Sequence, residues 1–355
     1  MRLPDNSFIF IMAGGSGERF WPLSRKNTPK QLLRLFSDES LLGETVNRVK
    51  SMVPAEQLFI LTNQLQVEPT QEVLPDFPVC QIVAEPAKRD TAPAAALATA
   101  LAYRQDPAAT VILLPADQLI THVDAYQQNL SDVAARASAG QSLLTLAIDP
   151  MYPSTGFGYL ELSDKTLTGR AGTDIYKVNR FVEKPDLMTA ESYLAAGNFA
   201  WNAGMFAWSA QAFLEIADQY TPELSAFVRD FPSGNPDRYL QEKFVTLPKI
   251  SVDYAIMEKA TAVEAAKATF DWDDVGAWTA LPAHLNRDDQ HNSIRGHATT
   301  LDAGNNIVFS SGRHIAVCGV QDLVIVETAD AVLVCHQDQV QNIKKLLPHL
   351  PEELL

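Results

Sequence analysis

The stretch from Phe8 to Gln31 constrains the fold more than any other part of the chain. It begins with an unbroken apolar run, Phe8 to Met12, which is too short for an isolated helix and too apolar for an edge strand. Such a run is typical of a strand buried on both faces of a parallel sheet. Gly14, Gly15 and Gly17 follow at once, so the next loop can adopt positive φ angles and bring backbone N–H groups against a ligand.

Two cations in the same stretch suit a phosphate ligand. Arg19 supplies a rigid guanidinium and Lys30 a mobile ammonium, and both bind phosphate oxygens well. The alternative is a glycine-rich turn with solvated cations, and the buried strand before the loop favours the binding loop. A dinucleotide-binding fingerprint would need glycine at Phe20, and a Walker loop would need Gly-Lys-Ser/Thr where Gly17-Glu18-Arg19 stands.

The overall charge narrows the classes of partner. The chain has 355 residues and a formal net charge of −15, which argues against nucleic acid or an anionic membrane as a partner. An anionic substrate must therefore be held by a local cluster of Arg, Lys and backbone amides. The length allows one large core, or one large domain and a small one.

The cysteines and the N-terminus indicate the compartment. Cys80, Cys318 and Cys335 are widely spaced and form no C-x-x-C pair, so neither a disulfide framework nor a zinc site is expected. The N-terminus shows no basic segment followed by a long apolar one, and no apolar run approaches the length of a membrane span. We expect a soluble, cytoplasmic protein.

Strand and helix patterns alternate over the first half of the chain. Buried strands are expected at 58–61, 81–84, 110–114 and 143–148, and amphipathic or alanine-rich helices at 42–53 and 93–103. This alternation predicts an α/β fold with a doubly wound, mostly parallel sheet. In such sheets ligands bind beyond the carboxyl ends of the strands, where the glycine loop, Glu85 and Asp117 fall.

The sequence pattern changes towards the C-terminus. A charged polar stretch at 286–292 marks a boundary, so we divide the chain into a catalytic domain, 1–290, and a C-terminal module, 291–355. Short Val/Ile-rich segments alternate with Gly, Asn and Asp turns over 296–334, which predicts an all-β module. A short helix is expected at 337–347.

Two aspartates are candidate metal ligands. Asp117 follows a buried strand, and Asp274 follows Trp272-Asp273, where Asp273 is a competing candidate. Each alone could equally be a cap or turn residue. Together they suit Mg²⁺, with Mn²⁺ as a substitute, because Mg²⁺ takes one or two carboxylates plus substrate phosphates.

Several motifs carry a family resemblance that extends over nearly the whole chain. Trp21-Pro22-Leu23-Ser24-Arg25, followed by Pro29-Lys30-Gln31, resembles the signature of the sugar nucleotidyltransferases, and among them the mannose-1-phosphate guanylyltransferases. Phe181-Val182-Glu183-Lys184-Pro185 matches a further motif of that family. Glu18 departs from the pattern, in which a smaller residue such as Thr is usual. Since a carboxylate would repel a triphosphate, we expect Glu18 to point away.

The resemblance implies a Rossmann-like nucleotidyltransferase fold with a small β-helix-like module, and it implies site residues in three groups. The catalytic and metal-binding group is Arg19, Lys30, Asp117 and Asp274. The nucleotide-binding group is Ala13, Gly14, Gly15, Gly17, Glu85, Arg89 and Thr91. The group for the sugar phosphate is Gly158, Glu183, Lys184 and Asn202. For Asn202 a buried turn residue is the alternative interpretation.

The reaction implied by the resemblance is transfer of GMP from GTP to mannose 1-phosphate, which gives GDP-mannose and pyrophosphate. No general base is required, because a phosphate monoester with a second pKa of about 6 is already anionic near neutral pH. Two alternatives stay open: another sugar 1-phosphate such as heptose 1-phosphate, and a catalytically silent subunit that binds nucleotide sugars. A homodimer is a possible assembly that the sequence does not fix.

Overall fold

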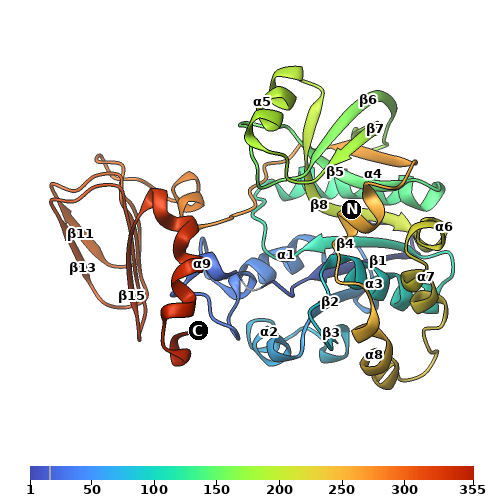
Figure 1. Cartoon of the computed structure of the whole chain (residues 1–355), viewed down its shortest axis with the longest axis horizontal. Coiled ribbons are helices and arrows are strands. Elements are labelled where there is room, and N and C mark those ends of the chain that lie inside the picture. Colours follow the sequence, from blue (N-terminus) through green and yellow to red (C-terminus); the bar gives the residue numbers. More distant parts are fainter. Residues whose placement is uncertain (16) are drawn as a thin grey trace.

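A computed structural model describes residues 1–15 and 17–355 of the chain. In this part of the chain one large mixed sheet is built from β1 (Ser7–Met12), β2 (Leu58–Asn63), β3 (Ile82–Glu85), β4 (Thr110–Pro115), β5 (Leu143–Ile148), β6 (Tyr159–Thr168), β7 (Asp174–Val182), β8 (Phe199–Ser209) and β9 (Val263–Lys267). Their order is β3-β2-β1-β4-β8-β5-β9-β7-β6. The α/β sheet predicted from the sequence is thus confirmed (Figure 1).

The expected first strand, β1, lies inside the parallel part of this sheet. It pairs in parallel with β2 on one side and β4 on the other. Phe8 and Phe10 point into one core, and Ile9 and Ile11 into the other. The helices of the catalytic part that cover the two faces and flank the sheet are α1 (Leu41–Val49), α2 (Val67–Val73), α3 (Thr91–Gln105), α4 (Val123–Ala139), α5 (Leu187–Ala196), α6 (Ala210–Tyr220), α7 (Pro222–Arg229) and α8 (Asp237–Lys243).

Buried small and apolar residues decide which helix covers which face. The alanine-rich α3 and the apolar sides of α6 and α7 pack in the core that contains Phe8 and Phe10. Helices α1 and α4 pack in the core on the other face, with Ile9 and Ile11. Helices on both faces leave the carboxyl ends of β1, β3 and β4 as the accessible edge of the sheet.

Strand β8 was not anticipated as a central strand. It pairs antiparallel with β4, where Trp208 lies opposite Val111, and also antiparallel with β5. Its segment is apolar at nearly every position, so no period of two marks it as a strand. The strand joins the parallel half of the sheet to β5, β9, β7 and β6.

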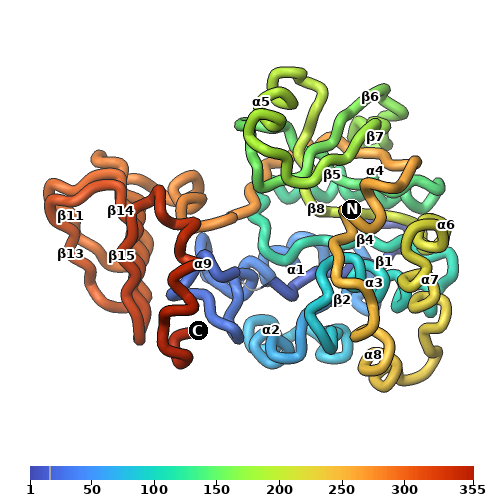
Figure 2. The backbone as a smooth tube through the Cα atoms, viewed as in Figure 1, coloured from blue at the N-terminus to red at the C-terminus, as the bar shows by residue number. Residues whose placement is uncertain are grey.

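The C-terminal module consists of short strands, as the sequence predicts. They are β10 (Ser293–Arg295), β11 (Ala298–Leu301), β12 (Ile307–Ser310), β13 (Ile315–Cys318), β14 (Leu323–Glu327) and β15 (Val332–His336). Parallel pairing of β10 with β12, of β12 with β14, and of β11 with β13 gives the coiled path visible in Figure 2. The helix expected at 337–347 is a 3₁₀ segment, Gln337–Asn342, then α9 (Ile343–Leu346) and a further 3₁₀ turn.

One hydrophobic core joins this module to the glycine-loop region. Phe20 contacts Trp278 at a ring-centroid distance of 5.2 Å, and Trp278 contacts Phe309 of β12 at 5.7 Å. Ile343 of α9 is buried in the same core. In Figure 1 the red C-terminal segment lies beside the blue segment that follows β1, in agreement with the packing of α9 on the 3₁₀ turn Glu18–Phe20. The domain division at 290/291 remains a prediction.

Candidate active site

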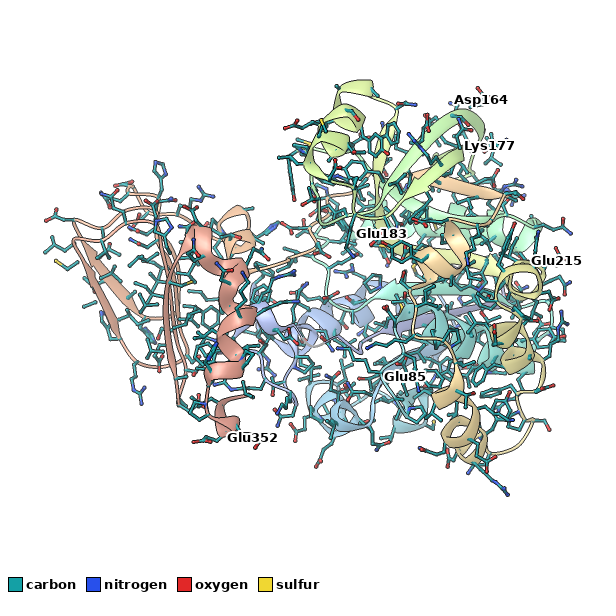
Figure 3. The ribbon with its side chains drawn as sticks, in the orientation of Figure 1. Glu85, Asp164, Lys177, Glu183, Glu215 and Glu352 are labelled. Carbon is teal, nitrogen blue, oxygen red and sulfur yellow. The ribbon has the colours of Figure 1, made fainter. Side chains whose placement is uncertain are left out.

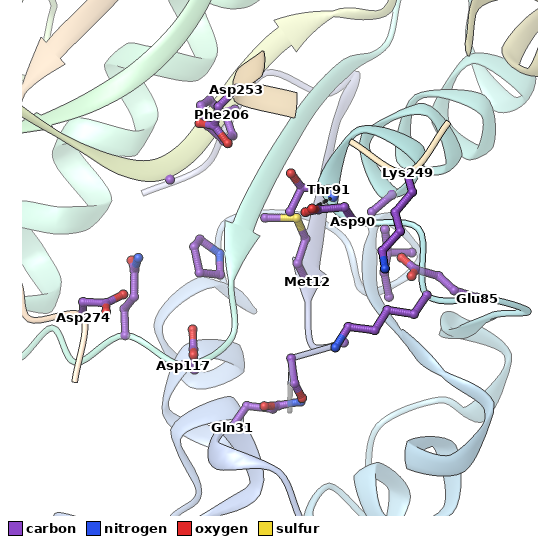
Figure 4. Close-up of a pocket in the computed structure, with 18 of the residues that line it drawn as sticks. Met12, Gln31, Glu85, Asp90, Thr91, Asp117, Phe206, Lys249, Asp253 and Asp274 are labelled. Carbon is purple, nitrogen blue, oxygen red and sulfur yellow. Dashed lines mark hydrogen bonds between the residues drawn. The ribbon is translucent and has the colours of Figure 1, made fainter. Parts of the chain in front are cut away.

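A cavity of about 520 Å³ lies at the carboxyl ends of β1, β3 and β4. It brings together seven of the residues that the sequence analysis selected, namely Gly14, Gly15, Glu85, Thr91, Asp117, Lys184 and Asp274. Figure 4 shows Asp117 and Asp274 at one end, Glu85 with Lys249 at another, and Asp253 at a third. The cavity is therefore bordered by three separate groups of charged side chains.

The glycine loop is held tightly against the Lys30 segment. Gly17 has a φ of +60°, and a β-carbon there would lie 2.3 Å from Cβ of Lys30. Any other residue at Gly17 would thus be strained both in its backbone and in its contact. The amide of Gln31 fixes the start of the loop by donating to the carbonyls of Ala13 (2.6 Å) and Gly15 (3.3 Å).

Lys30 lies between the two candidate metal ligands. Its ammonium is 2.9 Å from Oδ2 of Asp117 and donates to the backbone carbonyl of Asp274 at 2.5 Å. The lysine is buried, with 5% of its surface exposed. Burial raises the pKa of Asp274, and the positive charge of Lys30 opposes this shift. The two carboxylates, from the ends of distant segments, thus face one region that already attracts a cation.

The structure distinguishes Asp274 from its neighbour Asp273. Asp273 is held inside its own loop, where Oδ1 accepts from the N–H of Val275 at 2.7 Å and Oδ2 lies 2.7 Å from Nε2 of His284. Val275, a β-branched residue, has a φ of +49°, a conformation that the Asp273 contacts help to hold. Asp274 lines the cavity, whereas Asp273 does not.

Glu85 lies at the end of the cavity nearest β3. Burial raises the pKa of Glu85 to about 8. Lys88 and Lys249 line the same end, and Figure 4 shows Lys249 pointing towards Glu85. Next to it, Asp90 caps α3 by accepting from the Thr91 N–H at 2.8 Å, which orients this wall of the cavity.

Of the residues predicted to bind the sugar phosphate, Lys184 lines the cavity, and the others lie close to it without lining it. Lys184 pairs with Glu183 at 2.8 Å, and a β-carbon on Gly158 would lie 2.6 Å from Oε2 of Glu183. Asn202 donates to Oδ1 of Asp253 at 3.0 Å. In Figure 3, Glu183 lies on the side of β6 and β7, whereas Glu85 lies on the side of α2 and β3.

Asp253 is a site residue that the sequence analysis did not select. It lines the cavity beside Lys184, and burial, followed by the charge of Glu183, raises the pKa of Asp253 to about 7. From the sequence, Ser251-Val252-Asp253 resembles an ordinary helix start, and here it opens a short π-helical turn, Asp253–Met257. Only its contact with Asn202 reveals its place in the site.

The remaining residues that the sequence analysis selected do not line the main cavity. Gly17, Arg19 and Lys30 line a smaller adjoining cavity that shares Asp117 and Asp274. Ala13 is buried beneath the glycine loop, and its carbonyl accepts from Gln31. Arg89 donates to the carbonyl of Val245 and is not among the residues that line the main cavity.

The fold and site define a nucleotidyltransferase, and the comparisons with known proteins agree. The family model described as Nucleotidyl transferase matches residues 9–291, and the one described as MannoseP isomerase/GMP-like beta-helix domain matches residues 296–350. The chain therefore belongs to the nucleotidyl transferase family. The second match confirms the β-helix-like module predicted from the sequence.

The curated relatives and a solved structure narrow the class. Mannose-1-phosphate guanylyltransferases of Klebsiella pneumoniae and of Escherichia coli (strain K12) are 36% and 35% identical to this chain, and each alignment covers 96% of it, with 73% and 72% of the relative. The crystal structure of mannose-1-phosphate geranyltransferase from Thermus thermophilus superposes with a TM-score of 0.87 at 31% identity, covering 97% of this chain and 99% of that one. The chain is thus similar throughout to enzymes named for mannose 1-phosphate.

Two further observations on the described residues concern membrane-spanning helices and cysteines. None of the helices in residues 1–15 and 17–355 combines the length and hydrophobicity needed to span a membrane. Cys80, Cys318 and Cys335 are free thiols, in agreement with the expectation that no disulfide framework is present.

Proposed function

We propose that the protein is a mannose-1-phosphate guanylyltransferase, which converts GTP and mannose 1-phosphate into GDP-mannose and pyrophosphate. The observation that supports this proposal most strongly is one cavity that is lined by the glycine loop, Glu85, Lys184, Asp117 and Asp274. The names of the relatives support the choice of substrates.

In the proposed reaction a phosphate oxygen of mannose 1-phosphate attacks the α-phosphorus of GTP. The bond from that phosphorus to the bridging oxygen of the β-phosphate breaks, and pyrophosphate leaves in line with the attack. The nucleophile is already anionic near neutral pH, so no side chain has to remove a proton. The protein's part is to align two anions and to neutralise their charges.

Arg19 and Lys30 would bind the triphosphate. Nε of Arg19 is a buried N–H without a hydrogen-bond partner among the described residues, so it is a donor that a phosphate oxygen would satisfy. Lys30 would exchange Asp117 for a phosphate oxygen when the nucleotide enters. The neighbouring carboxylates then need another cation, and their hard oxygen donors suit Mg²⁺ or Mn²⁺. Such an ion, held by Asp117 and Asp274, would supply charge neutralisation between the two phosphates.

The end of the cavity that is lined by Lys184 and Asp253 would hold the sugar phosphate. Lys184 would pair with its phosphate, the carboxylates of Glu183 and Asp253 would accept hydrogen bonds from the sugar hydroxyls, and the amide of Asn202 would accept and donate. Glycine at 158 leaves room for the Glu183 carboxylate, since a β-carbon there would collide with it.

Glu85 would recognise the base. Guanine presents adjacent N–H donors on one edge, which a carboxylate accepts in pairs, whereas adenine presents an acceptor there. Burial favours the protonated form of Glu85, so the carboxyl would lose its proton when guanine binds, and Lys88 and Lys249, which line the same end of the cavity, would stabilise the resulting charge.

The test is pyrophosphate release, measured for the four NTPs combined with several sugar 1-phosphates, heptose 1-phosphate among them. We expect the highest kcat/KM for GTP with mannose 1-phosphate. A higher value with another pair would replace the substrates proposed here. No release with any pair, from a protein that still binds GDP-mannose, would favour the catalytically silent binding subunit.

A further inference from the structure

The smaller cavity beside the glycine loop includes a residue from the C-terminal module. This cavity of about 170 Å³ is lined by Gly17, Glu18, Arg19, Phe20, Lys30, Asp117, Asp274, Gly276 and Lys344. Lys344 belongs to α9, at the opposite end of the sequence from the glycine loop. It stands with Arg19 and Lys30 at the end of the site that lies away from Lys184 and Glu85.

The position of Lys344 is fixed by a packed interface. The preceding residue, Ile343, is buried in the core that also holds Phe20 and Trp21. Nε1 of Trp21 donates to the carbonyl of Leu354 at 2.9 Å. Because the module and the glycine-loop region share one core, Lys344 cannot move far from the cavity without opening that core.

In this state the ammonium of Lys344 is weakly engaged. Among residues 1–15 and 17–355 it forms an ion pair with Glu18, with Nζ 3.7 Å from Oε2, and the two side chains are 47% and 41% exposed. An exposed pair at this distance contributes little to stability. Glu18 lines the same cavity as Arg19 and Lys30, and its expected orientation away from the phosphates stays a prediction.

The charges around this cavity suit an anion that arrives with a cation. Arg19, Lys30 and Lys344 oppose Glu18, Asp117 and Asp274, so the side chains alone are formally balanced. A divalent cation at the two aspartates would leave an excess of positive charge. Inorganic pyrophosphate, or the β- and γ-phosphates of a nucleotide, would then be the matching ligand.

We propose that Lys344 is a pyrophosphate-binding residue, contributed by the C-terminal module to the leaving-group end of the active site, and that Glu18 competes with pyrophosphate for its ammonium. This proposal rests on the proposed function, which supplies pyrophosphate as the product. When the product leaves, Lys344 returns to Glu18, so the carboxylate favours release. Glu18, which departs from the family pattern, would thereby promote the release of pyrophosphate.

The first experiment is titration calorimetry of inorganic pyrophosphate in the presence of Mg²⁺. For Lys344→Met we expect binding weakened about fivefold, the effect of one partly exposed charged contact. The exposed neighbour Lys345 belongs to the same short helix, so Lys345→Met is the matched control and should bind like the parent. Lys344→Arg should restore most of the affinity. Equal affinities of the Met variants at 344 and 345 would overturn the proposal.

The second experiment separates binding from a merely structural pair. Glu18→Gln should bind pyrophosphate about threefold more tightly, since the competitor is removed, and the double variant with Lys344→Met should be as weak as Lys344→Met alone. If the pair only held the module in place, both single variants would lower the melting temperature and neither would change pyrophosphate affinity. That result would also overturn the proposal.

A kinetic measurement distinguishes this proposal from the proposed function. In the reverse reaction, Lys344→Met should raise the KM for pyrophosphate by about fivefold and leave the KM for the nucleotide sugar unchanged. A parent protein without any transferase activity, but with pyrophosphate binding that depends on Lys344, would refute the proposed function and leave the pyrophosphate site intact. An active parent with no such dependence would refute only the role of Lys344.

Discussion

The ammonium of Lys30 lies 2.9 Å from a carboxylate oxygen of Asp117. Asp117 follows the carboxyl end of β4, the strand that pairs with β1. The pair links the element proposed to bind phosphate to the one proposed to bind metal. A triphosphate that draws Lys30 away leaves Asp117 without its cation, so nucleotide binding and metal binding should be coupled.

The phosphate-binding role of Arg19 and Lys30 is the first prediction. Arg19→Ala and Lys30→Ala should each lower kcat by about 10²- to 10³-fold, because each removes a charge that stabilises the transition state. The exposed Lys26 lies on the same segment, and Lys26→Ala should keep the parental rate. Steady-state pyrophosphate release measures all three. Parental kinetics in either test variant would remove that residue from the mechanism.

The metal-binding role of Asp117 and Asp274 is the second prediction. Replacement of either by Asn keeps the shape but removes a charge, so kcat should fall by about a hundredfold while circular dichroism stays unchanged. EDTA should abolish turnover, and Mg²⁺ should restore it. Asp289→Asn, at an exposed position, is the control for a lost surface charge. An Asp274→Asn enzyme as fast as the parent would contradict the two-carboxylate site and make Asp273 the next candidate.

The third prediction concerns the sugar end of the cavity. Lys184→Ala should raise the KM for mannose 1-phosphate about tenfold and leave the KM for GTP nearly unchanged, since the ammonium would contact only the sugar's phosphate. Lys177 is exposed on β7, the strand that ends two residues before Lys184, so Lys177→Ala provides the matched control. A rise in the KM for GTP instead would mean that the two ends of the cavity are assigned the wrong way round.

The fourth prediction concerns the choice of base. Glu85→Gln should reduce the preference for GTP over ATP by about tenfold, or about 1.4 kcal/mol, because one acceptor of a guanine N–H becomes a donor. The measurement is the ratio of kcat/KM for the two nucleotides. An unchanged ratio would assign base recognition to backbone groups of residues 89–92.

The raised pKa of Glu85 also predicts how stability depends on pH. The folded state keeps the carboxyl protonated up to about pH 8, whereas the ordinary value is 4.5. Between these values the folded state binds more protons than the unfolded state, so this group's contribution to stability falls as pH rises through the window and levels off above it. Glu85→Gln removes this dependence of stability on pH. The variant should therefore have a higher melting temperature than the parent at pH 8.5, but not at pH 4.5. Glu72→Gln, at an exposed position, should show no such difference.

Local patterns were sufficient for much of the fold. The run Phe8–Met12 and the glycines after it predicted a buried strand and its loop, because hydrophobic burial and positive φ angles depend on adjacent residues. The alternation of elements predicted the α/β sheet. Strand β8 was missed as a partner of β4, since its mostly apolar segment shows no period of two and its partner is set by sheet order.

Within the site, the sequence by itself determined the chemical types: a glycine loop, two cations, two aspartates and a Glu-Lys pair. Tertiary structure alone decided which of them meet. It distinguished Asp274 from Asp273, placed Asp253 against Asn202, and brought Lys344 beside Glu18. The physical reason is that residue types and spacing are local properties of the chain, whereas proximity between residues far apart in the sequence is fixed by strand order and by the core shared between the module and the glycine-loop region.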